Sequence, residues 1–166
     1  MRFASKLIFF TALAMALAVP AAMADSPHFL FANSSVNTKS GALDVSFKEA
    51  GLGNTQVTEQ VTLTVDNATA TYQCFNHGGK HPKAGNNETV SSSLTTTGTF
   101  PVRNGQTTGT ISAGPPSQGD FSCPSGQDLY LVQVIYSGIT VTGSAGDFLG
   151  ATPDPADSGP VMILIS

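Results

Sequence analysis

Apolar and polar residues alternate with a period of two along several segments of the chain, a pattern typical of β-strands with one buried face. The first such segment is residues 43–48, in which every second side chain is apolar. The alternation returns over residues 57–65, where Glu59 is the one charged residue in the apolar phase, and again over residues 68–74. We therefore expect a strand in each of these three segments.

The apolar phase moves from odd to even positions at Asp66-Asn67. A tight hairpin at these two residues would pair Val65 with Ala68 on the same face. A β-bulge within one long strand would instead shift the phase by one residue. Both structures explain the pattern, so the sequence leaves the choice between them open.

More strands are predicted in the second half of the chain. Residues 94–102 and 106–113 have the pattern of a strand pair around Arg103-Asn104-Gly105, because Asn-Gly is a strong turn signal. Residues 129–141 are apolar in both phases, so we expect this strand at the centre of a sheet with both faces buried. Two short apolar segments predict the first and last strands: residues 28–31 and 161–165.

The remaining segments are predicted to be loops, and none is predicted to be a helix. Polar, Gly-rich or Pro-rich sequence predicts loops at residues 76–88, 114–119 and 143–160. No long segment after the first 24 residues has the 3.6-residue period of a helix. Seven or eight strands joined by turns predict a single β-sandwich of immunoglobulin-like architecture, with a β-barrel as the alternative.

Residues 1–24 have the pattern of a secretory signal peptide. A basic start is followed by an apolar run over residues 7–19 and by small residues just before Asp25. The apolar run is shorter than the roughly 20 residues that a transmembrane helix needs. We therefore predict cleavage before Asp25 and one secreted, extracellular domain over residues 25–166, without a membrane span.

Composition and charge narrow the classes of function. The chain has 7 Lys and Arg residues, 11 Asp and Glu residues and no Trp, for a formal net charge of -4. Because the first 24 residues hold two basic side chains and no acidic one, the remainder is more acidic still, at -6. Nucleic-acid binding and attachment to an anionic membrane surface both require clustered basic side chains. We therefore predict neither as a partner.

Cys74 and Cys123 are the two cysteines of the chain. An even number of cysteines in an exported protein predicts a disulfide, with two free thiols as the alternative. Cys74 also begins a C-x2-H-x3-H motif with His77 and His81, a spacing that would place three zinc or copper ligands on one loop. Because a disulfide would remove the thiolate and leave two histidines with no fixed fourth ligand, we predict no metal and no other cofactor.

The residues that could carry catalysis form no recognisable arrangement. No serine lies in a G-x-S-x-G motif, and the carboxylates are spread over turns and strand ends, where Asp often has a structural role. We therefore predict that the protein is not an enzyme, and keep a small secreted hydrolase with carboxylates from separate loops as an alternative. Asp147, Asp154 and Asp157 would supply oxygen ligands for Ca²⁺, but their spacing differs from that of an EF-hand, so we expect a solvated acidic loop.

Residues 70–74, Ala-Thr-Tyr-Gln-Cys, resemble the Y-x-C strand of immunoglobulin domains. In those domains the cysteine is the second of its pair, and a core Trp packs against the disulfide. Here Cys74 is the first of its pair and the chain has no Trp. We therefore retain the sandwich architecture and do not assign the chain to that family.

Three further segments resemble a group of small exported bacterial proteins of unassigned function: KEAGLG at 48–53, TYQCFNHGGKHPKAGNNET at 71–89 and FSCPSGQ at 121–127. The resemblance covers most of the predicted domain and implies export, a β-rich fold and pairing of Cys74 with Cys123. It implies no activity. It draws attention to the polar loop, whose candidate binding residues are Asn76, His77, Lys80, His81, Asn86 and Asn87.

These patterns predict a secreted, non-catalytic β-sandwich protein that acts as an extracellular interaction or cell-envelope-associated module. Its partner would be an extracellular ligand or a component of the cell envelope; the sequence leaves open which one, and also the oligomeric state. A carbohydrate-binding module, with residues 76–88 contributing polar contacts, is the alternative. The lack of Trp removes the usual aromatic platform for a sugar ring.

Overall fold

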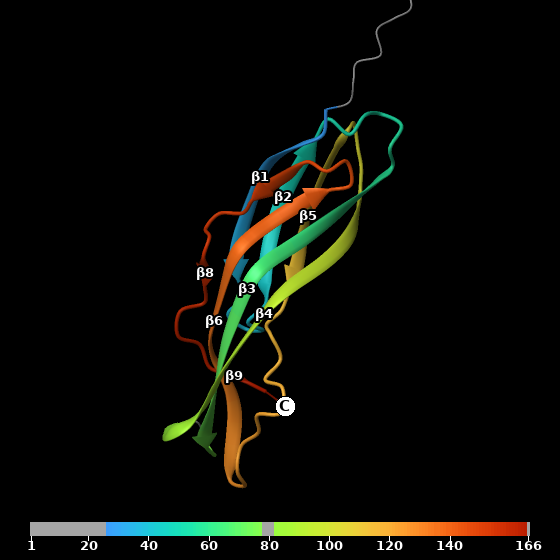
Figure 1. Cartoon of the computed structure of the whole chain (residues 1–166). Helices are drawn as coiled ribbons and strands as arrows, with labels where there is room; N and C mark the ends of the chain where they lie inside the picture. The colour runs from blue at the N-terminus through green and yellow to red at the C-terminus, as the bar shows by residue number, and fades with distance from the viewer. Residues whose placement is uncertain (1–25, 78–81, 166) are drawn as a thin grey trace, which may run out of the picture.

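The computed structural model describes residues 26–77 and 82–165, so the predicted signal peptide at residues 1–24 lies outside the described residues. The described chain has no helix and forms two antiparallel sheets packed against each other (Figure 1). This arrangement confirms the predicted all-β sandwich. The nine described strands are β1 (His28–Val36), β2 (Leu43–Ala50), β3 (Thr58–Asn76), β4 (Pro82–Pro101), β5 (Gln106–Ala113), β6 (Gln127–Gly143), β7 (Phe148–Gly150), β8 (Ala156–Asp157) and β9 (Ile163–Leu164).

The strands are divided between a small sheet and a large one. Sheet A has the strand order β1-β2-β5, and sheet B has the order β4-β3-β6-β7, with β8 and β9 also paired to β6. In sheet B the register places Val65 between Leu94 of β4 and Ile139 of β6. Because every second residue of a strand points to the same face, such registers align the apolar residues of neighbouring strands on the inner face.

The core lies between the two sheets and contains the alternating apolar residues that the sequence indicated. Phe47 of β2 is 1% exposed, and its ring contacts Phe29 and Phe100 edge to face, with centroid distances of 6.0 Å and 4.8 Å. Each such pair stabilises the fold by about 0.5–1.5 kcal/mol beyond the area that it buries. Other fully buried apolar residues are Leu43, Val45, Val61, Leu63, Val65, Leu131, Val134 and Val141.

The phase change at Asp66-Asn67 is a bulge within one 19-residue strand, β3. The register between β3 and β4 shifts between Val65 and Ala68, and both of these residues are buried. Asp66 and Asn67 are therefore turned outward. Gly138 of β6 lies beside them with a φ of 67°, where a Cβ atom would approach Asp66 Oδ2 to 2.4 Å. Only glycine fits both the conformation and the close approach.

The predicted turn at Arg103-Asn104-Gly105 is confirmed, but the strands that flank it do not pair with each other. Arg103 and Gln106 exchange backbone hydrogen bonds of 2.8 Å and 3.1 Å, and Asn104 and Gly105 have φ values of 52° and 70°. Both positive φ angles are those that a tight Asn-Gly turn requires. β4 pairs with β3 and β5 pairs with β2, so the chain passes from sheet B to sheet A at this turn.

Two of the predicted loops are wrong in extent. The loop expected over residues 76–88 is shorter, because β4 already begins at Pro82. The segment 143–160 is folded against the sandwich through β7 and β8, which pair with β6. The Gly- and Pro-rich residues 114–119 form no strand, as expected.

β6 lies inside sheet B as predicted, paired with β3 on one side and with the short strands on the other. Its two faces differ, however. Leu131, Val134 and Tyr136 are buried in the core, whereas Val132 and Ile135 are only half-buried. The expected burial of both faces is therefore wrong. The buried positions of β6 change from odd to even at the register shift against β3, between Thr71 and Tyr72, and return to odd opposite the bulge of β3. Apolar residues therefore occupy both phases.

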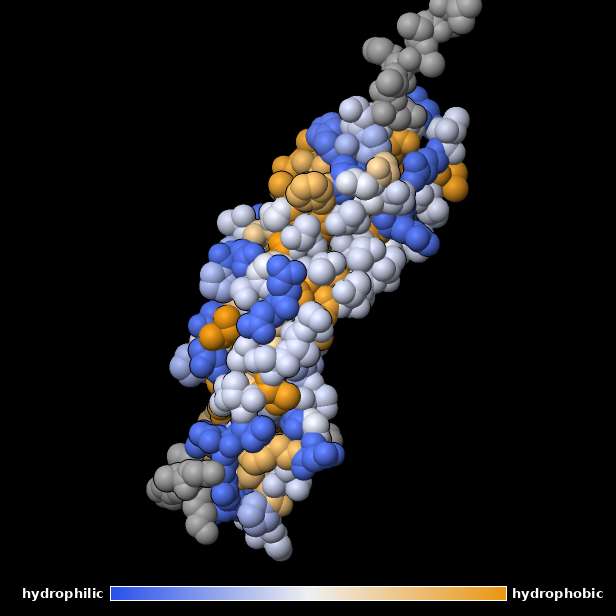
Figure 2. All heavy atoms as spheres, in the orientation of Figure 1, coloured by the Kyte–Doolittle hydropathy of each residue, from blue (hydrophilic) through white to orange (hydrophobic). Residues whose placement is uncertain are grey.

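The outer face of sheet B is rich in hydroxyl groups. Thr62 of β3 pairs with Thr97 of β4, and their hydroxyls are 2.9 Å apart. The hydroxyls of Thr69 and Ser91 are 3.0 Å apart in the same way. Figure 2 shows pale, weakly hydrophilic residues over the middle of the visible face, with small and separate orange groups. The high Thr and Ser content thus forms a solvated sheet face, for which Thr is well suited.

The strands of sheet B are much longer than those of sheet A. β3, β4 and β6 contain 19, 20 and 17 residues, whereas β2 and β5 contain 8 each. At about 3.3 Å per residue, β3 spans about 60 Å and β2 about 25 Å. The end of β3 and the beginnings of β4 and β6 therefore project past sheet A (Figure 1). We call this projection the arm; it comprises residues 73–77, 82–87 and 127–130.

Candidate functional site

The arm carries the predicted binding residues that the structure describes. Asn76 ends β3, His77 follows it, and Asn86 and Asn87 lie near the beginning of β4. Lys80 and His81 fall outside the described residues. The predicted set is thus divided between two strands that pair with each other, rather than carried by one long loop.

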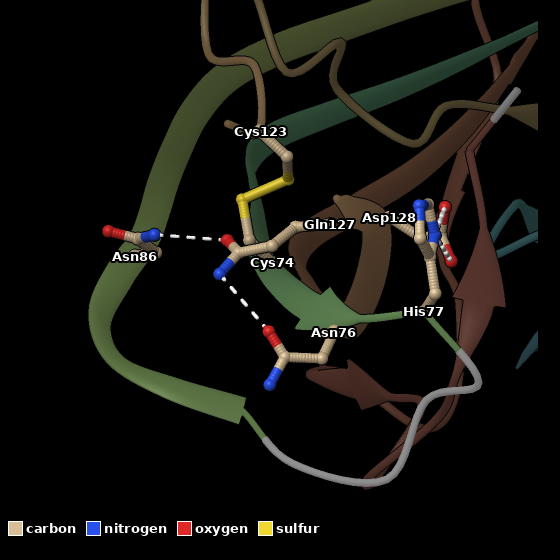
Figure 3. Close-up of a disulfide and its surroundings, with 7 residues drawn as sticks. All are labelled: Cys74, Asn76, His77, Asn86, Cys123, Gln127 and Asp128. Carbon is tan, nitrogen blue, oxygen red and sulfur yellow. Dashed lines mark hydrogen bonds and ion pairs between the residues drawn. A yellow bond between two sulfur atoms is a disulfide. The ribbon is translucent and has the colours of Figure 1, made fainter. Parts of the chain in front are cut away.

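A disulfide holds the base of the arm together. Cys74 of β3, which is fully buried, is bonded to Cys123 in the segment before β6, with 5.6 Å between the two Cα atoms (Figure 3). This confirms the predicted disulfide. Because both sulfur atoms are used in the bond, Cys74 supplies no thiolate to the C-x2-H-x3-H motif.

Three amide side chains from three strands form a hydrogen-bonded chain beside the disulfide. Asn86 Nδ2 donates to Gln127 Oε1 at 3.1 Å, and Gln127 Nε2 donates to Asn76 Oδ1 at 3.4 Å. Figure 3 shows that Asn86 Oδ1 and Asn76 Nδ2 point away from this chain. The chain therefore presents an acceptor at one end and a donor at the other. Gln127, which joins the two, was not among the predicted residues.

His77 and Asp128 lie together on the other side of Asn76. His77 Nδ1 is 3.2 Å from both carboxylate oxygens of Asp128, and the two side chains are 69% and 31% exposed. A polar contact this exposed contributes about 1 kcal/mol or less to stability. Its main effect is to fix the orientation of the imidazole at the surface of the arm (Figure 3).

Asn87 does not join this group. It pairs in register with Gln73 of β3, and strand alternation turns it to the face opposite Asn86. On the face of the arm opposite the amide chain, the rings of Phe75 and Tyr130 pack edge to face at 5.3 Å. Phe75 is buried and Tyr130 is half-buried. The arm therefore carries its amide chain on one face and a small aromatic pair on the other.

A second cluster, at the opposite end of β3, was not predicted. Glu49 at the end of β2 and Glu59 at the beginning of β3 are 0% and 1% exposed, and Asp147 reaches them from the turn between β6 and β7. Glu59 accepts hydrogen bonds from Ser144 N at 2.5 Å and from Gln56 Nε2. Among the described residues, none of the four carboxyl oxygens of Glu49 and Asp147 has a hydrogen-bond partner.

The environment of Glu49 favours its neutral form. Burial raises the pKa of Glu49 from 4.5 to about 8, and the negative charges of Asp147 and Glu59 add to that shift. Burial also raises the pKa of Asp147. The described residues include no group of three or more His, Cys, Asp or Glu side chains arranged to hold a metal ion. Glu49 and Glu59 are closed to solvent, so they do not offer a substrate the accessible carboxyl pair that glycoside hydrolysis uses.

The acidic residues weighed as Ca²⁺ ligands do not converge. Asp154 accepts hydrogen bonds from Gly138 N and Ile139 N, at 3.1 Å and 2.9 Å. Asp157 accepts from Gln133 Nε2, at 3.2 Å, while Asp147 belongs to the buried cluster. The expected solvated acidic loop is confirmed for Asp154 and Asp157, which are exposed while their carboxylates fasten the segment after β7 to β6. It is wrong for Asp147, whose carboxyl group is buried.

Comparison with known proteins adds no assignment to this geometry. The chain matches no protein-family model, no curated protein and no solved structure. In residues 26–77 and 82–165 no helix is long and apolar enough to cross a membrane.

Proposed function

We propose that this protein is an exported, non-catalytic binding module that engages an extracellular ligand or a cell-envelope component with the tip of its arm. The observation that carries the proposal is the position of Gln127, which is hydrogen-bonded to both Asn86 and Asn76 beside the disulfide of Cys74. No part of sheet A covers this group, because the arm extends past it (Figure 1).

The arm meets the main physical requirement of a recognition surface, which is order before the ligand arrives. Binding costs less when the polar groups that contact a ligand are already held in place. Here the three amides are fixed by one another, by two flanking strands and by the disulfide. The donor on Asn76 and the acceptor on Asn86 then remain for a partner.

A polyhydroxylated ligand is the second candidate, because the arm carries amides on one face and a half-buried aromatic ring on the other. Asn and Gln side chains each offer a donor and an acceptor, which is also what a sugar hydroxyl offers. Tyr130, packed edge to face on Phe75, is half-buried and so keeps part of its ring accessible. A carbohydrate-binding module would use the amides for hydroxyl groups on one face of the arm and this ring for the apolar face of a sugar on the other.

Two features support export. Residues 1–24 have the composition of a signal peptide, and the disulfide suits an oxidising compartment. The non-reduced intact mass of the protein recovered from the medium of its producer tests this part. A mass that begins at Asp25 and is two hydrogens lighter than the reduced chain is expected. Retention of residues 1–24 contradicts export.

The binding proposal is tested with Gln127→Ala, which removes the centre of the amide chain. The wild-type protein and this variant are incubated with insoluble cell-wall and polysaccharide fractions, and the bound fraction is measured. We expect the variant to bind at least ten-fold more weakly to any fraction that retains the wild type, with an unchanged melting temperature. Gln60→Ala is the matched control, since Gln60 is exposed on β3 far from the arm.

Four results distinguish the outcomes. Loss of binding in the presence of soluble oligosaccharide assigns the ligand to carbohydrate, and loss after protease treatment of the fraction assigns it to a protein. Equal binding by the wild type and Gln127→Ala contradicts the assignment to the arm. Failure of the wild type to bind any fraction contradicts the proposed function as a whole.

A further inference from the structure

A hollow of about 240 Å³ lies where the edge of sheet A meets the turn between β4 and β5, at the end of the sandwich away from the arm. Its position and chemistry are independent of the amide chain, so it does not rest on the function proposed above. The residues that line it are Lys48, Pro101, Arg103, Gln106, Thr107 and Thr108.

The hollow concentrates positive charge in an acidic protein. After the first 24 residues the chain has five basic side chains against eleven acidic ones, yet Lys48 and Arg103 both line this one space and no acid does. Neither is part of an ion pair among the residues that the structure describes. Glu49, next to Lys48 in sequence, is buried on the opposite face of β2.

The wall of the hollow is fixed by backbone and hydroxyl contacts that do not use the cationic groups. Lys48 lies directly opposite Thr108 in the register of β2 and β5, so both are on the outer face of sheet A. The backbone of Arg103 is held by two hydrogen bonds to Gln106. Thr107 Oγ1 donates to the carbonyl of Pro101 at 3.0 Å and joins the beginning of β5 to the end of β4.

We propose that this hollow binds an anionic oxygen group — a carboxylate, sulfate or phosphate — carried by a ligand no larger than about one sugar unit. A guanidinium donates two parallel hydrogen bonds to such groups, and an ammonium adds a compact positive charge. The side chains of Gln106 and Thr108 are exposed and can donate as well. The volume is below the roughly 300–1,000 Å³ of sites for drug-sized ligands, which sets the limit on size.

The test is a titration of the isotope-labelled protein by NMR, with sodium phosphate, sodium sulfate and sodium galacturonate at constant ionic strength. Galactose and sodium chloride are the control ligands, because they lack the oxygen anion. We expect saturable shifts of the amides at residues 48, 103 and 106–108 with at least one of the three anions, and none with the controls. Raising the salt concentration should weaken the binding.

Two variants and one control locate the site. Arg103→Gln and Lys48→Met should each weaken binding at least ten-fold, whereas Lys39→Met, which removes an exposed lysine near the other end of β2, should leave it unchanged. Arg103 is exposed, so its variant carries the test should Lys48→Met fail to fold.

Binding of all three anions assigns the hollow to the anionic group alone, and binding of galacturonate only assigns it to an anionic sugar; either result supports the proposal. Three results would overturn it. They are the absence of saturable shifts with every anion, equal binding by the wild type and both variants, and an equal loss of binding in Lys39→Met.

Discussion

Glu49 lies at the end of β2 with no exposed surface, and both of its carboxyl oxygens lack a hydrogen-bond partner among the described residues. An ionised carboxylate in such a place is far more costly than the neutral acid, because nothing replaces its hydration. The raised pKa of about 8 therefore means that the folded protein holds a proton on Glu49 at neutral pH. Folding and proton binding are coupled at this residue.

The first prediction is a loss of stability as the pH rises. The pKa of Glu49 is higher in the folded state, at about 8, than in the unfolded state, at about 4.5. The resulting stabilisation is complete below about pH 4.5 and is lost progressively up to about pH 8, by at most about 1.4 kcal/mol per pH unit. Urea denaturation at pH 5, 6, 7 and 8 measures this slope.

Glu49→Gln should flatten the slope and make the protein more stable than the wild type at pH 8. The raised pKa of Asp147 leaves a smaller slope of the same sign in this variant. Glu88→Gln, at an exposed position on β4, is the control and should keep the wild-type profile. Identical slopes in the wild type and Glu49→Gln would contradict the coupling.

The second prediction concerns Gly143, which is buried between the two unpartnered acids. A Cβ atom at this position would lie 2.7 Å from Asp147 Oδ1 and 2.9 Å from Glu49 Oε1. Gly143→Ala should therefore lower the free energy of unfolding by about 1–3 kcal/mol, because both side chains must move in a packed site. Thermal or urea unfolding measures the change.

Gly150→Ala is the matched control for this prediction. A Cβ atom at Gly150 would meet only Ile139 O, at 3.9 Å, which is ordinary contact. Its stability should stay near that of the wild type. Equal stability of the two alanine variants would mean that the buried acids are less tightly packed than this structure shows.

The residues of the buried cluster differ in how far the sequence could reveal them. Glu59 stands in the apolar phase of its strand, and Glu49 continues the apolar phase of residues 43–47, so strand alternation alone places both on the inner face. Asp147 gives no such signal, because it lies in a turn whose position depends on β6 and β7. The contact between the three acids depends on how the two sheets pack, and local periodicity does not show that packing.

At the scale of elements, local pattern located most strands but not their partners. A hairpin and a bulge both put Val65 and Ala68 on the same face, so the sequence could not separate them. The answer lies in the pairing of this part of β3 with residues 92–94 of β4 and 136–139 of β6, which are remote from it in sequence. The turn at Asn104-Gly105 was likewise predictable from its residues, whereas the passage of the chain from sheet B to sheet A there was not.

The strands of the arm were also hard to predict, because their residues are mostly polar. Residues 82–88 lack apolar alternation and were expected to be a loop, yet they pair with β3. Alternation arises when one face of a strand packs on a core. Because the arm projects past sheet A, this condition is missing there, and the pattern disappears although the strand does not. Gln127, the centre of the proposed site, gave no local signal for the same reason.

The third prediction concerns the disulfide as a constraint on the arm. Cys74 and Cys123 are separated by 49 residues, and closing a loop of this length stabilises a protein by up to about 4 kcal/mol through the unfolded state. Cys74→Ala with Cys123→Ala should therefore lower the free energy of unfolding by about 2–4 kcal/mol. Amide hydrogen exchange should also become faster at residues 73–77 and 127–130.

Urea denaturation and hydrogen exchange measured on the same sample check both parts. The wild type treated with reductant serves as the control, because it breaks the same bond without changing the side chains at the site. Equal stability of the oxidised and reduced wild type would contradict the role assigned to the disulfide.

At the scale of the whole molecule, the buried acids and the cationic hollow lie far from the amide chain of the arm. The buried acids and the cationic hollow lie toward one end, and the amide chain lies at the tip of the arm. β3 connects the two ends: Glu59 and Cys74 are fifteen residues apart on it, or about 50 Å along an extended strand. The extra length of sheet B over sheet A creates this separation.

The last prediction follows from that distance. Changes more than about 10 Å apart that share no partner usually alter the free energy of unfolding additively, within about 0.5 kcal/mol. Glu49→Gln should raise stability at pH 8, and loss of the disulfide should lower it. The combined variant should equal the sum of the two changes in urea denaturation at pH 8, provided that each protein unfolds in one cooperative transition.

A deviation from additivity would point to coupling along β3 or β6, since both strands run from the disulfide to the buried cluster. On β3 the bulge at Asp66-Asn67 lies between Glu59 and Cys74 and is the natural place for such coupling to be interrupted. Two transitions in the disulfide-free variant alone would mean that the arm unfolds before the body. An interaction of more than about 1 kcal/mol would contradict the independence of the two ends, and with it the assignment of recognition to an arm that acts apart from the sandwich core.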